Sequence, residues 1–135
     1  MEKTAGQIEG DLFKAIQTTD LQAGINGKIY RKGLRPLNSQ SEDAVIYFVD
    51  GVSGQKQKGN VEVNVFVPDK DNGTGVYTQN LSRTTAIEAA LAKILSQLPT
   101  TEYDLKLGDT IRTYEDKDSH QHFVCLSLDY SRITF

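Results

Sequence analysis

The sequence contains one cysteine, no tryptophan, three prolines and no long hydrophobic run. Its single thiol, Cys125, cannot form an internal disulfide, and a lone cysteine is typical of proteins from reducing compartments. No stretch approaches the ~20 consecutive apolar residues that a membrane-crossing helix needs. Residues 1–11 hold no cationic segment followed by an apolar block, so we expect no secretory signal there. These absences predict a protein that is neither secreted nor membrane-bound.

The composition predicts one ordinary globular domain. The chain has 135 residues and a mass of 15.0 kDa, with 38% hydrophobic and 24% charged residues. It is too short for two independent cores and too apolar for a disordered chain, so we expect a single domain over residues 1–135. The formal net charge is -3 and the sequence pI is about 5.3, whereas free-standing nucleic-acid-binding domains usually have a pI above ~9. Avid DNA binding is therefore not expected.

The charges are unevenly distributed along the chain. Residues 1–67 carry 8 basic and 8 acidic side chains, and the remaining residues carry 7 and 10, so the acidic excess lies in the second half. Four cations of the first half fall within eight residues, and two lysines follow in a later polar segment: Lys28, Arg31, Lys32, Arg35, Lys56 and Lys58. A solvated loop is the simplest interpretation of this cluster. The alternative is a contact surface for an acidic partner.

Two segments have the hydrophobic spacing of amphipathic helices, and they span residues 4–18 and 85–98. Each begins with a predicted capping box: Thr4 with Gln7, and Thr85 with Glu88. The apolar stripes are Ile8, Leu12, Phe13 and Ile16 in the first helix and Ile87, Leu91, Ile94, Leu95 and Leu98 in the second. Each stripe needs an apolar partner, so both helices are expected to pack on a sheet.

The other apolar segments predict strands. Residues 44–49 form a compact apolar run, typical of a strand covered on both faces, and are the best candidate for a central strand. In residues 61–67 four valines alternate with other residues, which directs the valines to one face. Further strands are expected at residues 28–31, 103–114 and 120–130, with a bulge or bend at Gly108-Asp109. Exposed or flexible connections are expected at residues 20–27, 32–43, 50–60 and 69–75. This order predicts an α+β fold, a mostly antiparallel sheet with two main helices packed on one face.

Several residue pairs suggest chemistry, but none completes a site. His120 and His122 lie two apart on a predicted strand, as a metal pair requires, yet Cys125 has the opposite parity and cannot be the third ligand. Asp116 and Asp118 lie in a solvated turn, where nothing separates their pKa values for acid and base catalysis. The sequence therefore predicts no catalytic residue, no metal site and no cofactor.

One set of segments carries a family resemblance. It consists of the opening helix with Leu12-Phe-Lys-Ala-Ile16, the strand entry Ile25-Asn-Gly-Lys-Ile-Tyr30, the strand Val45-Ile-Tyr-Phe48, the valine ladder Val61 to Val67, the helix from Thr85, and the closing hairpin with Asp118-Ser-His-Gln-His122. In this order the segments resemble the tail-completion proteins of long-tailed phages, the small tail-terminator or head-tail joining family. The resemblance spans nearly the whole chain and rests on element order and hydrophobic spacing. The polar segment Leu37 to Asp43 departs from the family's pattern.

The resemblance implies a structural component of the virion, assembled in the host cytoplasm, that forms a ring at the junction of tail and capsid. Such rings are commonly hexamers, bind no cofactor and catalyse nothing. The implied partners are further copies of the chain, tail-tube proteins and head-completion proteins, with DNA only passing through the lumen. Two other functions stay open: a small cytosolic ligand-binding domain with a deep apolar pocket, and an uncharacterised enzyme with clustered ionisable groups.

A ring requires that one patch of each subunit complements a different patch of its neighbour. We expect the basic cluster of the first half to meet acidic groups of a neighbour, and the segments 51–59 and 69–75 to become ordered on assembly. The predicted subunit-interface residues are Lys28, Arg31, Lys32, Arg35, Lys56, Lys58, Asp69 and Asp71.

Overall fold

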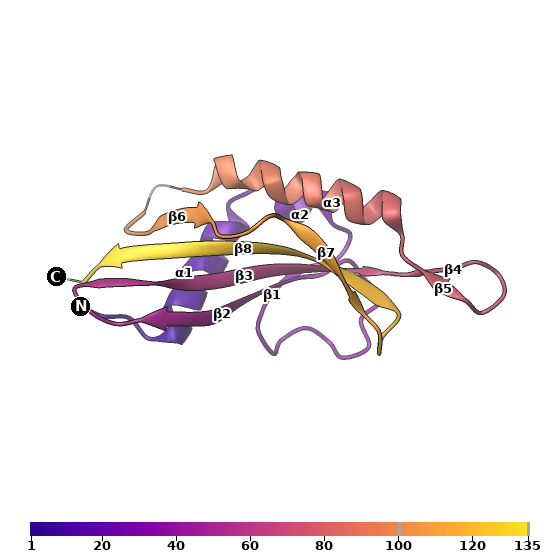
Figure 1. Cartoon of the computed structure of the whole chain (residues 1–135), viewed down its shortest axis with the longest axis horizontal. Coiled ribbons are helices and arrows are strands. Elements are labelled where there is room, and N and C mark those ends of the chain that lie inside the picture. Colours follow the sequence, from indigo (N-terminus) through magenta and orange to yellow (C-terminus); the bar gives the residue numbers. More distant parts are fainter. Residues whose placement is uncertain (100, 135) are drawn as a thin grey trace.

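The structure is a computed structural model that describes residues 1–99 and 101–134, and its fold is α+β, as predicted (Figure 1). The helices are α1 (Ala5–Gln17), α2 (Leu21–Gly24) and α3 (Leu81–Ile94), and the 3₁₀ turn η1 (Leu95–Gln97) follows α3. The strands are β1 (Ile29–Arg31), β2 (Ala44–Val52), β3 (Lys56–Pro68), β4 (Lys70–Asp71), β5 (Tyr77–Thr78), β6 (Asp104–Leu107), β7 (Arg112–Asp116) and β8 (Gln121–Ile133).

One large sheet organises these elements. Its strands follow the order β1-β2-β3-β8-β6, and β7 also pairs with β8, so that β6 and β7 succeed each other along the outer edge of β8. β3 and β8 are paired along their whole length of 13 residues. The pairs are antiparallel except for β1 with β2, which is parallel. The small sheet of β4 and β5 forms an arm that extends beyond the end of the large sheet opposite both termini (Figure 1).

The large sheet has one apolar face, and both main helices pack on it. The alternation predicted for residues 61–67 is confirmed, because its four valines are at most 1% exposed. They pack with apolar side chains of the helices and neighbouring strands: Ile8, Leu12, Ile16, Ala44, Ile46, Ile87, Leu91, Ile94, Val124, Leu126 and Leu128. Burial of each Leu or Ile stabilises the fold by about 1.5–3 kcal/mol before conformational entropy is counted. Strand side chains alternate between faces, so the residues between these core residues lie on the opposite face of the sheet. No helix among the described elements covers that face.

The start of α1 is as predicted. The Thr4 hydroxyl accepts a hydrogen bond from the Gln7 backbone at 3.2 Å, and the Gln7 side chain accepts one from the Thr4 backbone at 2.9 Å. This reciprocal pair satisfies two backbone donors of the first turn. The segment after α1, expected to be a turn over residues 20–27, contains the short helix α2, whose Leu21 is fully buried against α3.

The predicted start of α3 is wrong. The helix begins a turn earlier than Thr85, because the side chain of Asn80 accepts a hydrogen bond from the backbone of Arg83 and caps it there. Glu88, expected to complete a capping box with Thr85, instead accepts a hydrogen bond from the Thr113 hydroxyl of β7 at 2.7 Å. A short polar side chain before an apolar run is a cap signal wherever it stands, and Asn80 provides it as well as Thr85 does.

Two segments predicted to be flexible connections contain strands. Residues 50–60 form a hairpin in which β2 and β3 stay paired, with Asp50 opposite Asn60 and Val52 opposite Lys58. Their polar side chains are compatible with a strand because one face of the sheet is open to water. Residues 69–75 contain β4 and the tip of the arm.

Two strand predictions need correction as well. Residues 44–49 do lie in β2, but β3 and β8 occupy the middle of the sheet. The strand expected at residues 103–114 is divided into β6 and β7 by residues 108–111, which include the Gly108-Asp109 pair predicted to form a bulge or bend. A Cβ atom at Gly108 would lie 2.7 Å from the Asp129 carboxylate of β8, so a larger residue there would displace that carboxylate.

The packing of α3 yields the first testable prediction. We predict that Leu91→Ala lowers the free energy of unfolding by about 2–5 kcal/mol, because the Leu91 side chain is fully buried between α3 and the sheet. Leu95→Ala should cost less, since Leu95 in η1 is only partly buried. Urea unfolding followed by circular dichroism measures both losses. A loss for Leu95→Ala as large as that for Leu91→Ala would contradict this packing.

Candidate functional site

The face of the large sheet opposite the two main helices carries no helix among the described elements. We call it the helix-free face. It carries the residues that alternate with the core residues of the two central strands: Asn60, Glu62, Asn64 and Phe66 on β3 and Phe123, Cys125, Ser127 and Asp129 on β8. This face is aromatic near the arm, uncharged or weakly charged in the middle, and strongly charged near the termini.

A polar group lies in the middle of the helix-free face. The Tyr47 hydroxyl donates to the Glu62 carboxylate at 2.9 Å and accepts from the Asn64 amide. Cys125 lies opposite Asn64 in the β3–β8 register and is 8% exposed. Burial and the neighbouring Glu62 carboxylate raise the pKa of the Cys125 thiol to about 12. The thiol is therefore protonated at neutral pH, whereas a nucleophilic cysteine must be a thiolate.

An aromatic group lies nearer the arm and holds the connection between β1 and β2. The Phe123 ring lies between those of Phe66 and Tyr114, with ring centres 5.5 and 5.4 Å apart. The Arg35 guanidinium, from the β1–β2 connection, lies 4.4 Å from the centre of the Phe66 ring. A cation over an aromatic face at this distance is attracted by the ring quadrupole. The connection is thereby folded back onto the helix-free face.

The end of the same connection is buried and ionic, which corrects the prediction that residues 32–43 are an exposed connection. Glu42 is only 4% exposed. Arg83 of α3 donates to both of its carboxylate oxygens at 2.7 Å. This bidentate pair links the connection to α3 and satisfies a carboxylate that would otherwise be costly to bury.

Asp43, the next residue, is 2% exposed and accepts hydrogen bonds from three directions. The donors are the Lys28 backbone at 2.9 Å, the Arg35 guanidinium at 3.0 Å and the Ser39 hydroxyl. Burial by itself would raise the pKa of Asp43, but hydrogen bonds from Ser39, Lys28 and Arg35 outweigh it, and the pKa lies below its ordinary value. Asp43 is therefore a structural carboxylate that stays ionised.

The two histidines do not form the metal pair that their spacing suggests. His122 Nδ1 lies 2.6 Å from the Asp69 carboxylate. His120 precedes β8 in a left-handed turn with a φ of 53° and stacks on Tyr77, with ring centres 4.2 Å apart. Across residues 1–99 and 101–134, no group of three or more His, Cys, Asp or Glu side chains could hold a metal ion.

Asp116 also has a structural role. Its carboxylate accepts from the Ser119 hydroxyl at 2.7 Å and from the Gln121 amide at 3.2 Å. The hydrogen bond from Ser119, followed by that from Gln121, lowers the pKa of Asp116 despite partial burial. It is an ionised acceptor in the β7–β8 turn, and a general acid needs the opposite shift.

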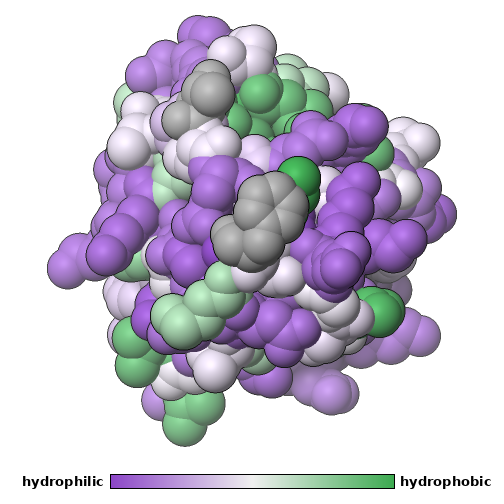
Figure 2. All heavy atoms as spheres, turned by 90° about the vertical axis from the view of Figure 1, so that its left-hand side faces the viewer, coloured by the Kyte–Doolittle hydropathy of each residue, from purple (hydrophilic) through white to green (hydrophobic). Residues whose placement is uncertain are grey.

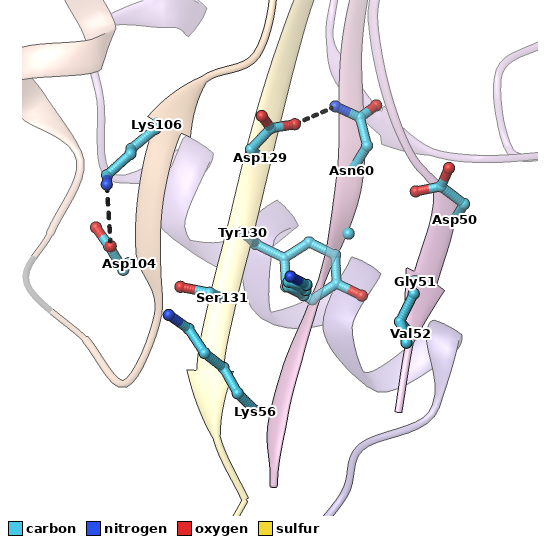
Figure 3. Close-up of a pocket in the computed structure, with 12 residues that line it drawn as sticks. Asp50, Gly51, Val52, Lys56, Asn60, Asp104, Lys106, Asp129, Tyr130 and Ser131 are labelled. Atoms are coloured by element: carbon cyan, nitrogen blue, oxygen red, sulfur yellow. Dashed lines mark hydrogen bonds and ion pairs between the residues drawn. The ribbon is translucent and has the colours of Figure 1, made fainter. Parts of the chain in front are cut away.

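A shallow hollow lies on the helix-free face at the end that holds the termini (Figure 3). Its lining comes from β2, β3, β6 and β8 and includes Asp50, Lys56, Lys58, Asn60, Asp104, Lys106, Asp129 and Ser131. Asn60 donates to Asp129 at 3.1 Å, and Lys106 lies 3.8 Å from Asp104. Lys56 and Lys58 form no ion pair with any carboxylate in the described part of the chain. Both signs of charge border the hollow, which fits a polar macromolecular contact better than an apolar small molecule.

The predicted subunit-interface residues fall into two groups. Some are engaged inside the chain: Arg31 donates to the Glu9 carboxylate at 3.1 Å, Arg35 and Asp69 are paired as described, and the Asp71 carboxylate accepts from the backbone of Gly73 and Gly75 at the tip of the arm. The others are exposed lysines: Lys28, Lys32, Lys56 and Lys58. Lys28 and Lys32 flank β1, and Lys56 and Lys58 border the hollow, so the structure separates these cations into two surfaces.

Sequence reasoning missed the buried carboxylates at positions 42 and 43 and the hollow near the termini. The sequence does contain a signal for the buried carboxylates. Two adjacent acidic residues directly before a fully apolar strand lie at the edge of the core, where a carboxylate needs hydrogen-bonding or charged partners. A signal for the second is the alternation of Lys56, Lys58 and Asn60, which has the period of a strand.

No known protein family matches the sequence, and no curated protein matches it. None of the helices in the described part of the chain is long and apolar enough to cross a membrane.

We predict that Asp43 contributes to stability in a pH-dependent way. Because its folded pKa is below the unfolded value, the contribution is complete above about pH 4 and is lost as the pH falls through the folded pKa. Asp43→Asn should lower the free energy of unfolding at pH 7 by about 1–3 kcal/mol and make the loss on acidification shallower. Urea unfolding at several pH values tests this, with the exposed Asp118→Asn as control. The same acid dependence in Asp43→Asn and the unaltered protein would contradict it.

We also predict that Cys125 reacts slowly in the folded protein. A buried, protonated thiol should be alkylated by iodoacetamide at pH 8 at least about tenfold more slowly than in urea-unfolded chain. Mass spectrometry over a time course measures both rates. Equal rates would show an accessible thiolate and would reopen the possibility of nucleophilic chemistry.

Proposed function

We propose that this chain is a non-catalytic structural protein that assembles with copies of itself into a ring, as its resemblance to tail-terminator and head-tail joining proteins implies. The observation that carries the proposal is the arm. It extends past the large sheet (Figure 1), and its Val76 and Tyr77 are 55% and 44% exposed. A hairpin of two short strands has little stability by itself. A neighbouring molecule that covers the exposed apolar side chains of the arm would stabilise it.

The shape of the subunit supports a ring. The arm and the termini lie at opposite ends of the large sheet (Figure 1). If one end contacts the other end of the next copy, the contact is heterologous, and such contacts close into rings when the rotation between copies is right. We propose that this ring is part of a virion, at the junction of tail and capsid, where it meets tail-tube and head-completion proteins and DNA passes only through its lumen.

The chemistry of the described residues supports assembly over turnover. The side chains that could have acted as nucleophile, acid or metal ligand have structural partners: Cys125 is buried and protonated, Asp116 shapes a turn, and His122 pairs with Asp69. A ligand-binding domain typically encloses an apolar pocket, whereas the hollow near the termini is bordered by charged side chains on an open sheet surface.

The test is the mass of the native protein in solution. We predict that multi-angle light scattering over a wide concentration range gives a mass that rises from 15.0 kDa toward roughly six times that value. Because assembly is a mass-action equilibrium, the larger species should dominate at the highest concentration. A mass of 15.0 kDa at every concentration would contradict the proposal.

A further inference from the structure

The arm and the β7–β8 turn form one unit at the end of the molecule away from the termini. The Tyr77 ring of the arm stacks on His120 of the turn, with centres 4.2 Å apart, and the Asp69 backbone donates to the His120 carbonyl at 2.9 Å. We call residues 69–78 and 115–120 together the arm end. Its base is fixed by these contacts, and its tip and outer surface are free in the single chain.

The arm end presents exposed apolar side chains beside negative charge. Val76 and Tyr77 are exposed on the arm. Residues 115–118 contain three carboxylates and one lysine, and the exposed Glu115 and Asp118 form no ion pair with any cation of the described residues. A partner for this surface should therefore be positively charged and carry some apolar area.

The end of the molecule that holds the termini carries two lysines, unpaired among the described residues, beside exposed apolar side chains, in a hollow that is also lined by Asp50, Asp104 and Asp129. Lys56 and Lys58 are exposed there without an ion pair among residues 1–99 and 101–134. Ile133 lies opposite Lys56 and Val52 lies opposite Lys58 in the strand register, and these two apolar side chains are 57% and 63% exposed. We call these four residues the terminal patch. Figure 2 shows this end of the molecule: its surface is largely hydrophilic, with hydrophobic residues in separate small groups.

We propose that the arm end of one copy docks on the terminal patch of the next copy. In this contact the carboxylates of Glu115 and Asp118 face Lys56 and Lys58, and the apolar side chains of the arm cover those of the patch. The proposal rests on the proposed ring and names the surfaces that build it. Exposed charges of opposite sign favour the encounter and fix its register, and the covered apolar area adds affinity.

The positions of the two surfaces make this contact heterologous. They lie at the two ends of β3, whose 13 residues span about 43 Å at ~3.3 Å per residue. One subunit cannot bring its own arm end to its own terminal patch over that distance. Each copy therefore has one surface that receives an arm and one arm that docks, and a ring forms when these two contacts are made with different neighbours.

Charge reversal at each surface tests the contact. Lys56→Glu with Lys58→Glu makes the terminal patch negative, and Glu115→Lys with Asp118→Lys makes the arm end positive. Each double variant alone places like charges against each other, so the concentration for half-assembly, measured by light scattering, should rise at least about tenfold. An equimolar mixture of the two should assemble near the concentration of the unaltered protein, because each altered surface then meets one of opposite charge.

The control for net charge is Lys28→Glu with Lys32→Glu, which changes the same number of exposed lysines beside β1. It should assemble like the unaltered protein. If it blocks assembly and the Lys56 and Lys58 variant does not, the contact lies at β1 and the docking proposal is wrong. Circular dichroism and thermal unfolding check that every variant is folded.

A second variant tests the apolar part without changing charge. Val76→Ser should raise the concentration for half-assembly several-fold, whereas Leu37→Ser, at a fully exposed leucine of the β1–β2 connection, should leave it unchanged. An unaltered protein that stays monomeric overturns the ring and the docking together. An unaltered protein that assembles while the charge variants and Val76→Ser assemble equally well overturns only the docking.

Discussion

The pairing of β3 with β8 is the interaction on which the rest of the structure depends. Its 13 paired residues supply the apolar face that α1 and α3 cover, and β2, β6 and β7 are added at its sides. The same pair joins the two ends of the chain. Arg132 of β8 donates to Gln57 of β3 at 2.7 Å and to Glu102 at 2.7 Å, and the Met1 amine donates to the Thr134 carbonyl. One long strand pair thus sets the distance between the terminal patch and the arm.

Buried ion pairs determine which surfaces stay available. Arg83 with Glu42 and Arg35 with Asp43 satisfy two buried carboxylates of a segment that the sequence predicts to be exposed. Burying such pairs costs desolvation energy, and removing one partner leaves an uncompensated charge. The pairs therefore mainly fix the positions of the segments that they join. They hold the β1–β2 connection against the sheet and α3. Exposed charges without an ion pair among the described residues include Glu115 and Asp118 at the arm end and Lys56 and Lys58 in the terminal patch.

The sequence predicts strands and helices well where burial imposes a regular spacing of apolar residues, and poorly where it does not. The valines of β3 and the stripe from Ile87 to Ile94 had to face the core, and they do. Residues 50–60 have the composition of a loop, but a strand with one face open to water can carry the same lysines and glycines. The partners of the buried carboxylates were hidden by separation in the chain, since Glu42 and Arg83 are 41 residues apart. Within the candidate site, the charge of Lys56 and Lys58 is visible in the sequence, whereas the ion pairs of Arg31 with Glu9 and of Arg35 with Asp43 depend on tertiary contacts.

The central claim is that the helices shield one face of the sheet and that copies meet through the two ends of the molecule, the arm end and the terminal patch. Hydrogen exchange measured by mass spectrometry at low and high protein concentration tests this most directly. At high concentration the account predicts slower exchange in the arm, residues 69–78, and in the first residues of β3, with no change in α1 or in residues 32–41. Slower exchange in β1 and its flanking residues, with the arm and β3 unchanged, would contradict the account.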